Sequence, residues 1–346
     1  MHVLAIDQGT SGTKAVVVAP DGTVLAAAEV AHAPRHLGSG TGTGSGTGTG
    51  TSGGVEHDPE TIWQAVVTTG RRALAEAALP DGALAAVALA NQGETVLAWD
   101  RATGTPLSPA IVWQDRRAAV VTDTLRARGA AEEVARRTGL VLDPYFSAPK
   151  LRWLRDQGTT GGVVTTTDTW LVHRLCGTFV TDVSTAGRSM LTALADPTAW
   201  DPDLLDLFGL ADEPLPAIVA SDDVVGTTDV FGPRVPVTGL VVDQQAALLA
   251  QGCWEAGTAK CTFGTGAFLL AQTGTEAVLS TSGLTTSPAW RLRGENRFCV
   301  DGQVYTAASA VDWLAGLGVL GSAAEIDAVA ADDAAGVQFV PALTGL

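Results

Sequence analysis

Two aspartates stand where an apolar run of the sequence gives way to a turn rich in glycine or glutamine. Asp7 follows the run 3–6 and precedes a Gly-Thr-Ser-Gly turn, while Asp243 follows the run 238–242 and precedes two glutamines. An aspartate in this position can bind Mg²⁺, directly or through water, or accept a proton from a substrate hydroxyl. One such aspartate alone is more typical of a turn cap. Two in the same context favour a chemical role.

The glycine-rich turn after Asp7 has a counterpart later in the chain. Residues 9–14 read GTSGTK, and residues 262–266 read TFGTG. Glycine lets backbone N–H groups approach an anion closely, and threonine and serine hydroxyls add further donors. Neither turn matches the P-loop pattern, because Gly9 lies too close to Lys14. Each turn alone is more typical of a plain hairpin, but together with the two aspartates they predict two halves that clamp a nucleotide.

Apolar runs and caps predict the elements that position these residues. Residues 3–33 predict a three-stranded meander, and Asp58 followed by proline predicts the start of a helix. The run 85–90 predicts a buried strand, and 95–99 predicts a strand returning from it. After the run that ends at Asp243, small residues predict a helix over 244–251. A second hairpin, expected over 259–272, follows this helix, which places a domain boundary near residue 250.

Residues 38–54 read GSGTGTGSGTGTGTSGG and contain overlapping G-x-G spacings. A dinucleotide-binding fingerprint requires a strand immediately before it and an amphipathic helix immediately after it. Here an irregular stretch precedes the repeat, and the repeat simply continues. Its side chains are too small to pack, and its backbone entropy is high. We therefore expect residues 38–54 to form a flexible surface insert.

Length and charge limit the classes of function. A chain of 346 residues exceeds the usual size of one core, which predicts two domains. The net charge of −16 argues against nucleic acid and anionic membranes as partners. Four scattered cysteines fit neither a zinc site nor a disulfide scaffold, so we expect buried thiols in a reducing compartment. The N-terminus lacks a signal-peptide core, and no apolar run approaches the roughly 20 residues of a membrane span. These features predict a cytoplasmic protein.

Seven short motifs occur in order along the chain and carry a family resemblance. They are DQGTS (7–11), NQGET (91–95), IVWQDRR (111–117), DPYFS (143–147), DTWL (168–171), DQQAA (243–247) and GTG (264–266). With them, the chain resembles the FGGY family of carbohydrate kinases, and its WQDRR and DPYFS stretches are more similar to glycerol kinases than to pentulose kinases.

The resemblance implies an α/β fold of the actin-like ATPase (ribonuclease-H-like) type, with nucleotide and polyol between two domains. Residues 1–250 would form the N-terminal domain, which holds the polyol and phosphates. Residues 251–346 would form part of the C-terminal domain on the nucleotide side, with the remainder, including the segment that holds adenosine, lying beyond this chain.

Individual residues take roles from the same resemblance, with ATP and Mg²⁺ as the implied cofactors. Asp243 matches the general base that accepts the proton of the attacking primary hydroxyl. Asp7 and Asp243 match metal-holding positions, with Asp7 acting through water. The residues that match polyol-binding positions are Glu94, Trp113, Tyr145, Asp243, Gln244 and Phe268. Those that match positions around the phosphates are Thr10, Ser11, Lys14, Thr265 and Gly266.

Three residues depart from the family pattern. Gly93 stands where glycerol kinases usually carry an arginine that binds substrate hydroxyls, so the choice of polyol is open. Ala308 and Asp312 replace the glycine and glutamine expected near the nucleotide. We expect Gly93→Arg to improve the use of glycerol if glycerol is the natural substrate.

Three functions remain open from the sequence. The leading expectation is an ATP- and Mg²⁺-dependent kinase that phosphorylates glycerol or a related polyol or sugar. The second is a truncated or degenerate relative that binds a polyol without phosphoryl transfer. The third is an actin-like ATPase that acts on a protein partner, which Glu94, Trp113 and Tyr145 argue against. Homo-oligomerisation is left undecided.

Overall fold

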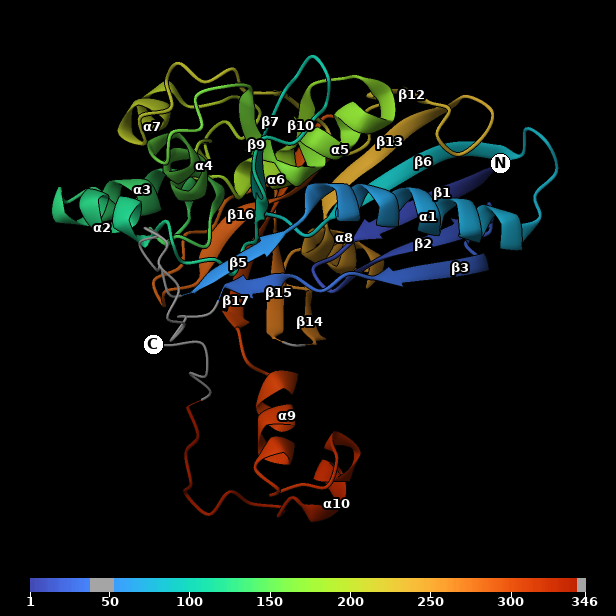
Figure 1. The fold of residues 1–346 in the computed structure, drawn as a ribbon. Helices are drawn as coiled ribbons and strands as arrows, with labels where there is room; N and C mark the ends of the chain where they lie inside the picture. The colour runs from blue at the N-terminus through green and yellow to red at the C-terminus, as the bar shows by residue number, and fades with distance from the viewer. Residues whose placement is uncertain (38–52, 265, 341–346) are drawn as a thin grey trace, which may run out of the picture.

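The largest sheet in the described part of the chain has six strands (Figure 1). The structure is a computed structural model that describes residues 1–37, 53–264 and 266–340. In sheet order the strands are β12 (Gly226–Thr228), β13 (Val235–Val242), β6 (Leu84–Asn91), β1 (His2–Gln8), β2 (Gly12–Val18) and β3 (Val24–Ala31). β13, β6 and β1 run parallel, and β2 and β3 continue from β1 as antiparallel neighbours. The predicted meander is confirmed.

Helix α1 (Pro59–Ala77) covers β2 and β3 and provides the crossover between β3 and β6 (Figure 1). Its start is the predicted one, because the Asp58 carboxylate accepts a hydrogen bond from the Glu60 N–H and proline occupies the first turn. Ile62 and Val66 are fully buried against the sheet. An amphipathic helix on one sheet face completes the core that this sheet needs.

A second sheet has the order β4-β5-β8-β7-β9 and packs against helices from the segment between β8 and β9. Its strands are β4 (Arg35–Leu37), β5 (Gly54–His57), β8 (Ala110–Ile111), β7 (Val96–Trp99) and β9 (Val163–Thr166). The prediction that 95–99 returns along 85–90 is wrong, because β7 pairs with β8 and β9. The backbone is left-handed at both Gly93 and Glu94, with φ of 63° and 42°, and there the chain leaves the first sheet.

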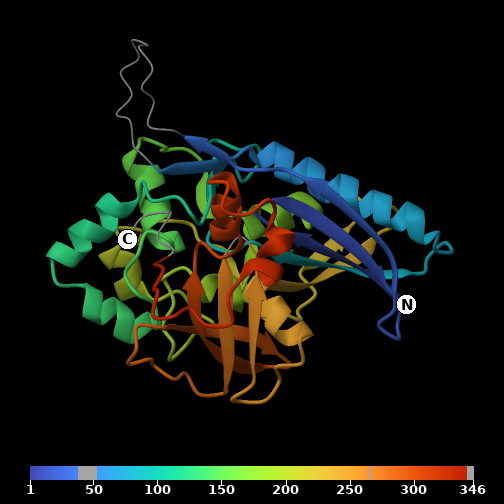
Figure 2. The same ribbon diagram turned by 90° about the horizontal axis from the view of Figure 1, so that it is seen from below.

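Short helices and one two-stranded parallel sheet fill the region between residues 119 and 219. They are α2 (Ala119–Ala127), α3 (Ala131–Thr138), α4 (Ser147–Asp156), α5 (Thr167–Cys176), β10 (Val180–Asp182), α6 (Val183–Gly187), α7 (Pro202–Leu207) and β11 (Ala217–Val219). Figure 2 shows α2 and α3, in green, at the end of the molecule away from the N-terminus.

The third sheet is antiparallel, with the order β14-β15-β17-β16. Its strands are β14 (Ala259–Phe263), β15 (Ala267–Gly274), β17 (Glu295–Val304) and β16 (Thr285–Leu292). Helix α8 (Asp243–Ala250) packs against it through Leu248, which joins a small core with Leu270 and Trp290. The predicted helix after Asp243 and the predicted second hairpin are both confirmed. The helical pieces α9 (Ala308–Gly316), η1 (Ala323–Glu325) and α10 (Ile326–Val329) project away from this sheet in Figure 1.

Two expectations about the chain change with the structure. All four cysteines are free thiols, but only Cys253 and Cys299 are buried, whereas Cys176 is half-buried and Cys261, on the edge strand β14, is exposed. The expectation of four buried thiols is therefore wrong. Most of the expected insert, residues 38–52, lies outside the described residues, and Gly54 already belongs to β5. No helix in the described part of the chain combines the length and apolar character needed to cross a bilayer.

Candidate active site

A cleft of about 590 Å³ lies between the first and third sheets. One wall carries the β1–β2 turn and the ends of β6 and β13, and the opposite wall carries the β14–β15 hairpin and β17. The predicted residues found along the cleft are Thr10, Ser11, Glu94, Trp113, Tyr145, Asp243, Gln244, Gly266 and Phe268. This volume is typical of a pocket for a small organic ligand.

Asp7 and Asp243 lie at the same edge of the first sheet. β1 and β13 flank β6, with Asp7 and Val241 both in register with Ala90, and Asp243 comes two residues later. The carboxyl ends of parallel strands meet at one edge, where ligands of open α/β sheets bind. Two strand spacings place the backbones of β1 and β13 about 10 Å apart. The two aspartates therefore lie at one sheet edge, where Asp243 lines the cleft and Asp7 lies beside it rather than in its wall.

The carboxylates influence each other's protonation. The protein atoms packed around the half-buried Asp243 raise its pKa to about 7, and the negative charges of Asp7 and Glu94 add to this effect. Asp7 is accessible from solvent, but the atoms around its carboxylate still raise its pKa, and Lys14 opposes that rise. A group with a pKa near 7 can accept a proton during a reaction at neutral pH.

Both glycine turns are closed by a short backbone hydrogen bond. The Gly9 N–H donates to the Gly12 carbonyl over 3.0 Å, and the Gly264 N–H donates to the Gly266 carbonyl over 2.8 Å. A Cβ at Gly12 would lie 2.9 Å from the Val30 carbonyl oxygen, and one at Gly266 would lie 2.7 Å from that of Val304. No larger residue fits without moving backbone, so these glycines let the strands close tightly beside the cleft.

The residues predicted to surround the phosphates do not all line the cleft. Thr10, Ser11 and Gly266 line the cleft. Lys14 is exposed and stands opposite Asp7 in the β1–β2 register, beside the cleft rather than in its wall. Thr265 lies outside the described residues.

Aromatic rings form one side of the cleft. The ring centroid of Trp113 lies 5.5 Å from Tyr145, 6.1 Å from Phe268 and 6.3 Å from Tyr305. The Trp113 indole N–H donates to the Thr10 hydroxyl over 2.8 Å, which connects this wall to the first glycine turn. Rings of this kind provide an apolar surface for the carbon edge of a polyol. Sequence reasoning identified three of the four aromatic residues and missed Tyr305.

Lys260 is a functional candidate that sequence reasoning missed. Its Nζ donates to the Gln244 side-chain oxygen over 2.6 Å and to the Thr262 hydroxyl over 2.8 Å. Burial lowers the pKa of Lys260, and the charge of Asp243 opposes that change. A cation beside the carboxylate would also lie near anionic groups bound in the cleft. Lys260 could have been identified from its position on β14, within the predicted hairpin.

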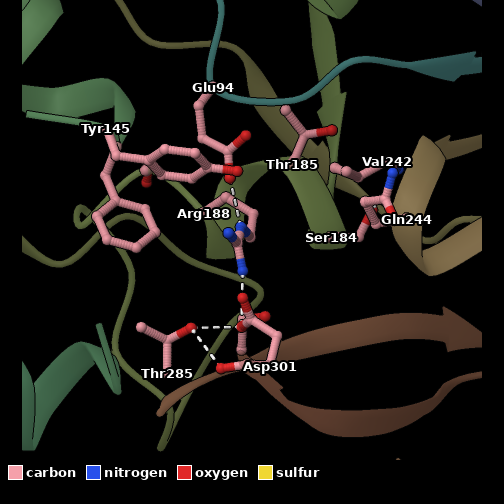
Figure 3. A network of polar contacts seen from close by, with 12 residues as sticks. Glu94, Tyr145, Ser184, Thr185, Arg188, Val242, Gln244, Thr285 and Asp301 are labelled. Atoms are coloured by element: carbon pink, nitrogen blue, oxygen red, sulfur yellow. Dashed lines mark hydrogen bonds and ion pairs between the residues drawn. The ribbon is translucent and has the colours of Figure 1, made fainter. Parts of the chain in front are cut away.

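Glu94 is held by a buried arginine that sequence reasoning also missed. Arg188 Nε donates to the Glu94 carboxylate, and Arg188 Nη1 donates to Asp301 over 2.9 Å (Figure 3). Burial raises the pKa of Glu94, whereas the charges of Arg188 and Lys150 oppose that rise. The sequence signal for Arg188 was a charged residue within a stretch of mostly small residues, 184–191.

The donor set fits Mg²⁺ held partly by substrate. Across the described residues, no group of three or more histidine, cysteine or acidic side chains could enclose a metal ion. Mg²⁺ in kinases is usually bound by one or two carboxylates, waters and substrate phosphates rather than by a protein cage. Asp7 and Asp243, whose charges repel each other at one edge of the first sheet, supply that number, and a cation between them would relieve the repulsion.

The backbone at Gly93 changes what an arginine there would do. Gly93 has a φ of +63°, and a Cβ would lie 3.1 Å from Val242 Cγ1. We predict that Gly93→Arg lowers the free energy of unfolding by about 1–2 kcal/mol, the usual cost of a left-handed backbone for a residue with a Cβ. Urea denaturation would measure it. Gly161→Arg is the control, because Gly161 is exposed, its backbone is not left-handed, and a Cβ there would meet nothing closer than Leu107 Cδ1 at 3.8 Å. A Gly93→Arg protein as stable as the parent would contradict the prediction.

Comparisons with known proteins agree with this geometry. Residues 2–250 match the model of the FGGY family of carbohydrate kinases, N-terminal domain. A glycerol kinase of Thermus brockianus is 42% identical over 359 aligned positions, which cover 100% of this chain and 70% of that protein. A glycerol kinase of Alkalilimnicola ehrlichii is 43% identical and is covered to the same 70%, with 99% of this chain aligned.

Solved structures share the fold. The crystal structure of Plasmodium falciparum glycerol kinase with ADP superimposes with a TM-score of 0.85 at 28% identity, covering 94% of this chain and 65% of that one. The xylulose kinase of Rhodospirillum rubrum superimposes with a TM-score of 0.83 at 23% identity, covering 100% of this chain and 70% of that one. The expected sugar-kinase fold of the actin-like ATPase type is confirmed.

Proposed function

The chain belongs to the FGGY family of carbohydrate kinases, and we propose that it phosphorylates a primary hydroxyl of glycerol or a related polyol or sugar with ATP. The observation that carries this proposal is the cleft in which a carboxylate with a pKa of about 7 lies between an aromatic wall and two glycine turns. Such a cleft brings an alcohol and a phosphate chain together. Phosphoryl transfer depends mainly on such positioning and on charge stabilisation.

In the proposed reaction, the substrate hydroxyl oxygen attacks the γ-phosphorus of ATP. Its proton passes to Asp243, an oxygen–phosphorus bond forms, and the bond to the β–γ bridging oxygen breaks to release ADP. Glu94 accepts hydrogen bonds from the remaining hydroxyls, and the Gln244 amide accepts or donates them. Trp113 and Phe268 pack against the carbon edge. The phosphates are surrounded by Thr10 and Ser11 of the first glycine turn and by Gly266 of the second.

Mg²⁺ would be held near Asp7 and Asp243, and when bound it neutralises phosphate charge. The protein side of this arrangement is the pair of carboxylates at one sheet edge. Lys14, beside Asp7, and Lys260, beside Asp243, add positive charge on either side of the phosphates. Charge of this sign is what a transferring phosphoryl group requires.

We also propose a division of the chain into residues 1–250 and 251–346. The third sheet supports it, because among the described residues β14 to β17 pair only with each other, and they share a small core that includes Leu270 and Trp290. Helix α8 contributes Leu248 to that core although it precedes the boundary, so the two parts pack through this helix.

A kinase of this kind would act where ATP is abundant, in the cytoplasm.

The proposed activity predicts ADP release that depends on a polyol. With purified full-length protein, ATP and Mg²⁺, at least one of glycerol, a ketose and an alditol is expected to give turnover of about 1–100 per second. A coupled assay measures ADP. The rate measured without polyol, which reports hydrolysis of ATP, is subtracted as background. Polyol binding by calorimetry without any ADP release would instead establish the noncatalytic alternative. Absence of both binding and turnover with glycerol, the ketose and the alditol would contradict the kinase function and the noncatalytic alternative alike.

A further inference from the structure

Arg188 lies between two carboxylates that come from different sheets. Glu94 follows the end of β6 in the first sheet, and Asp301 belongs to β17 in the third sheet. Figure 3 shows the guanidinium between the two acidic side chains. The side chains of Arg188, Glu94 and Asp301 are only 5%, 3% and 7% exposed. A buried ionic link therefore joins the two walls of the cleft.

The geometry of this link restricts both carboxylates. Arg188 uses Nε for Glu94 and Nη1 for Asp301, and the Thr285 hydroxyl donates a further hydrogen bond to Asp301. The guanidinium carbon lies 5.7 Å from the ring centroid of Tyr145. A planar guanidinium with several donors in a fixed plane sets the direction as well as the distance of its partners. Glu94 is consequently held in one orientation by its contact with Arg188.

The charges explain why the arginine cannot be removed without effect. One cation is shared by two carboxylates in a region that water barely reaches, and removing one partner of a buried pair leaves uncompensated charge. Without Arg188, Glu94 and Asp301 would face each other across the walls with no cation between them. They would then separate, take up protons or admit water, and each of these changes would alter the cleft.

The link is part of the pocket rather than a distant staple. Glu94, Tyr145, Arg188 and Asp301 line the same cleft as Trp113 and Asp243. The hydroxyl-binding side of the cleft therefore includes residues from both sheets. A polyol that contacts Glu94 is two side chains away from β17.

We propose that Arg188 is a positioning residue for the polyol pocket, which orients Glu94 as a hydrogen-bond partner for a substrate hydroxyl and ties it through Asp301 to the third sheet. The pocket is complete only while the two sheets are docked through this link. This inference rests on the proposed function, because it assigns Arg188 to the polyol side of the same site. It concerns binding of the alcohol and not the transfer of the phosphoryl group.

The test is Arg188→Gln in the full-length protein. The dissociation constant for the preferred substrate among glycerol, a ketose and an alditol is measured by calorimetry without ATP. Loss of a charged hydrogen-bond network predicts binding that is about 10- to 100-fold weaker. In the coupled assay, the KM for that polyol is expected to rise by a similar factor, while the KM for ATP changes less than about 2-fold. A purely structural role would not separate the two KM values.

Arg117→Gln is the matched control. Arg117 also lies between two carboxylates, 2.7 Å from Glu56 and 2.8 Å from Asp115, and its side chain is 6% exposed. It does not line the cleft. Both variants are expected to lower the midpoint of thermal unfolding by several degrees, because both break buried ion pairs. Only Arg188→Gln is expected to weaken polyol binding.

Asp301→Asn tests the connection to the third sheet. It is expected to weaken polyol binding less than Arg188→Gln does, because Glu94 keeps its cation. The double variant Arg188→Gln/Asp301→Asn is expected to lose less than the sum of the single losses, since the two residues share one network.

The outcomes separate this inference from the proposed function. If the parent binds and phosphorylates a polyol but Arg188→Gln binds it equally well, or Arg117→Gln loses as much affinity, the inference is overturned and the proposed function stands. If the parent neither binds nor phosphorylates any of the three substrate classes, both are overturned. A selective loss in Arg188→Gln, with the ATP response unchanged, supports the inference.

Discussion

Asp243→Asn is expected to lower kcat by about 10³-fold or more, with a change of less than about 10-fold in the dissociation constant for the polyol. A general base acts in the transition state, so its loss affects turnover much more than binding of the ground state. Asparagine keeps the size and the hydrogen bond that Asp243 accepts from the Gln244 N–H over 2.6 Å. Steady-state kinetics and calorimetry on the same preparations would measure both quantities.

The same substitution has a defined pH dependence. Asp243 must be deprotonated to accept a proton and has a pKa of about 7, so the parent's kcat should fall about tenfold per pH unit below pH 7 and level off above it. The kcat of Asp243→Asn should not show this fall below pH 7. Because the folded-state pKa lies above the ordinary value of 3.8, the folded state binds more protons than the unfolded state between these values. Stability conferred by protonated Asp243 is lost as pH rises, and Asp243→Asn should unfold at a higher temperature than the parent above pH 7.

Asp168→Asn is the control for this prediction. Asp168 is buried, has a pKa raised to about 6 by that burial, and accepts a hydrogen bond from Thr181 away from the cleft. Its substitution can change stability but should leave the kcat of the folded protein within about 3-fold, as expected of a residue remote from the reacting atoms. Equal losses of turnover and polyol binding in Asp243→Asn would contradict the assignment of Asp243 as the base.

Lys150→Met is expected to lower the free energy of unfolding by about 3 kcal/mol, because it leaves buried acceptors without their donor. Lys150 is fully buried, and its Nζ donates to the backbone carbonyls of Pro144, Tyr145 and Phe146. Methionine has a similar length, so the packing volume changes little and the lost hydrogen bonds dominate. Tyr145 belongs to the aromatic wall, so the affinity for polyol should fall as well. Urea denaturation and calorimetry measure the two effects.

Lys14→Met provides the comparison for stability. Lys14 is exposed on β2, where removal of the same ammonium group should change the free energy of unfolding by less than about 0.5 kcal/mol. Lys150→Met with the stability of the parent would show that water reaches the three carbonyls, and the prediction would be wrong.

Much of the framework around the site was predictable from local patterns. The first three strands, the helix that begins after Asp58 and the hairpin 259–272 all follow from runs of apolar residues closed by caps or glycine turns. These signals act between residues a few positions apart, so they are visible in the sequence. The return of 95–99 onto 85–90 was mispredicted for the opposite reason. Which sheet a buried strand joins depends on partners far away, and β7 found them in β8 and β9.

The sequence by itself determined the local conformation of the two turns and the placement of Asp7 and Asp243 at strand ends, because hydropathy patterns, glycine and caps act over neighbouring residues. Only the tertiary structure decided that Arg188 joins Glu94 to Asp301 and that Tyr305 completes the aromatic wall. Glu94 and Arg188 are separated by 94 positions, and Arg188 and Asp301 by 113. Charges this far apart in the chain acquire partners only when packing removes them from water, since burial makes an unpaired ion costly and leaves the nearest opposite charge as its stable environment.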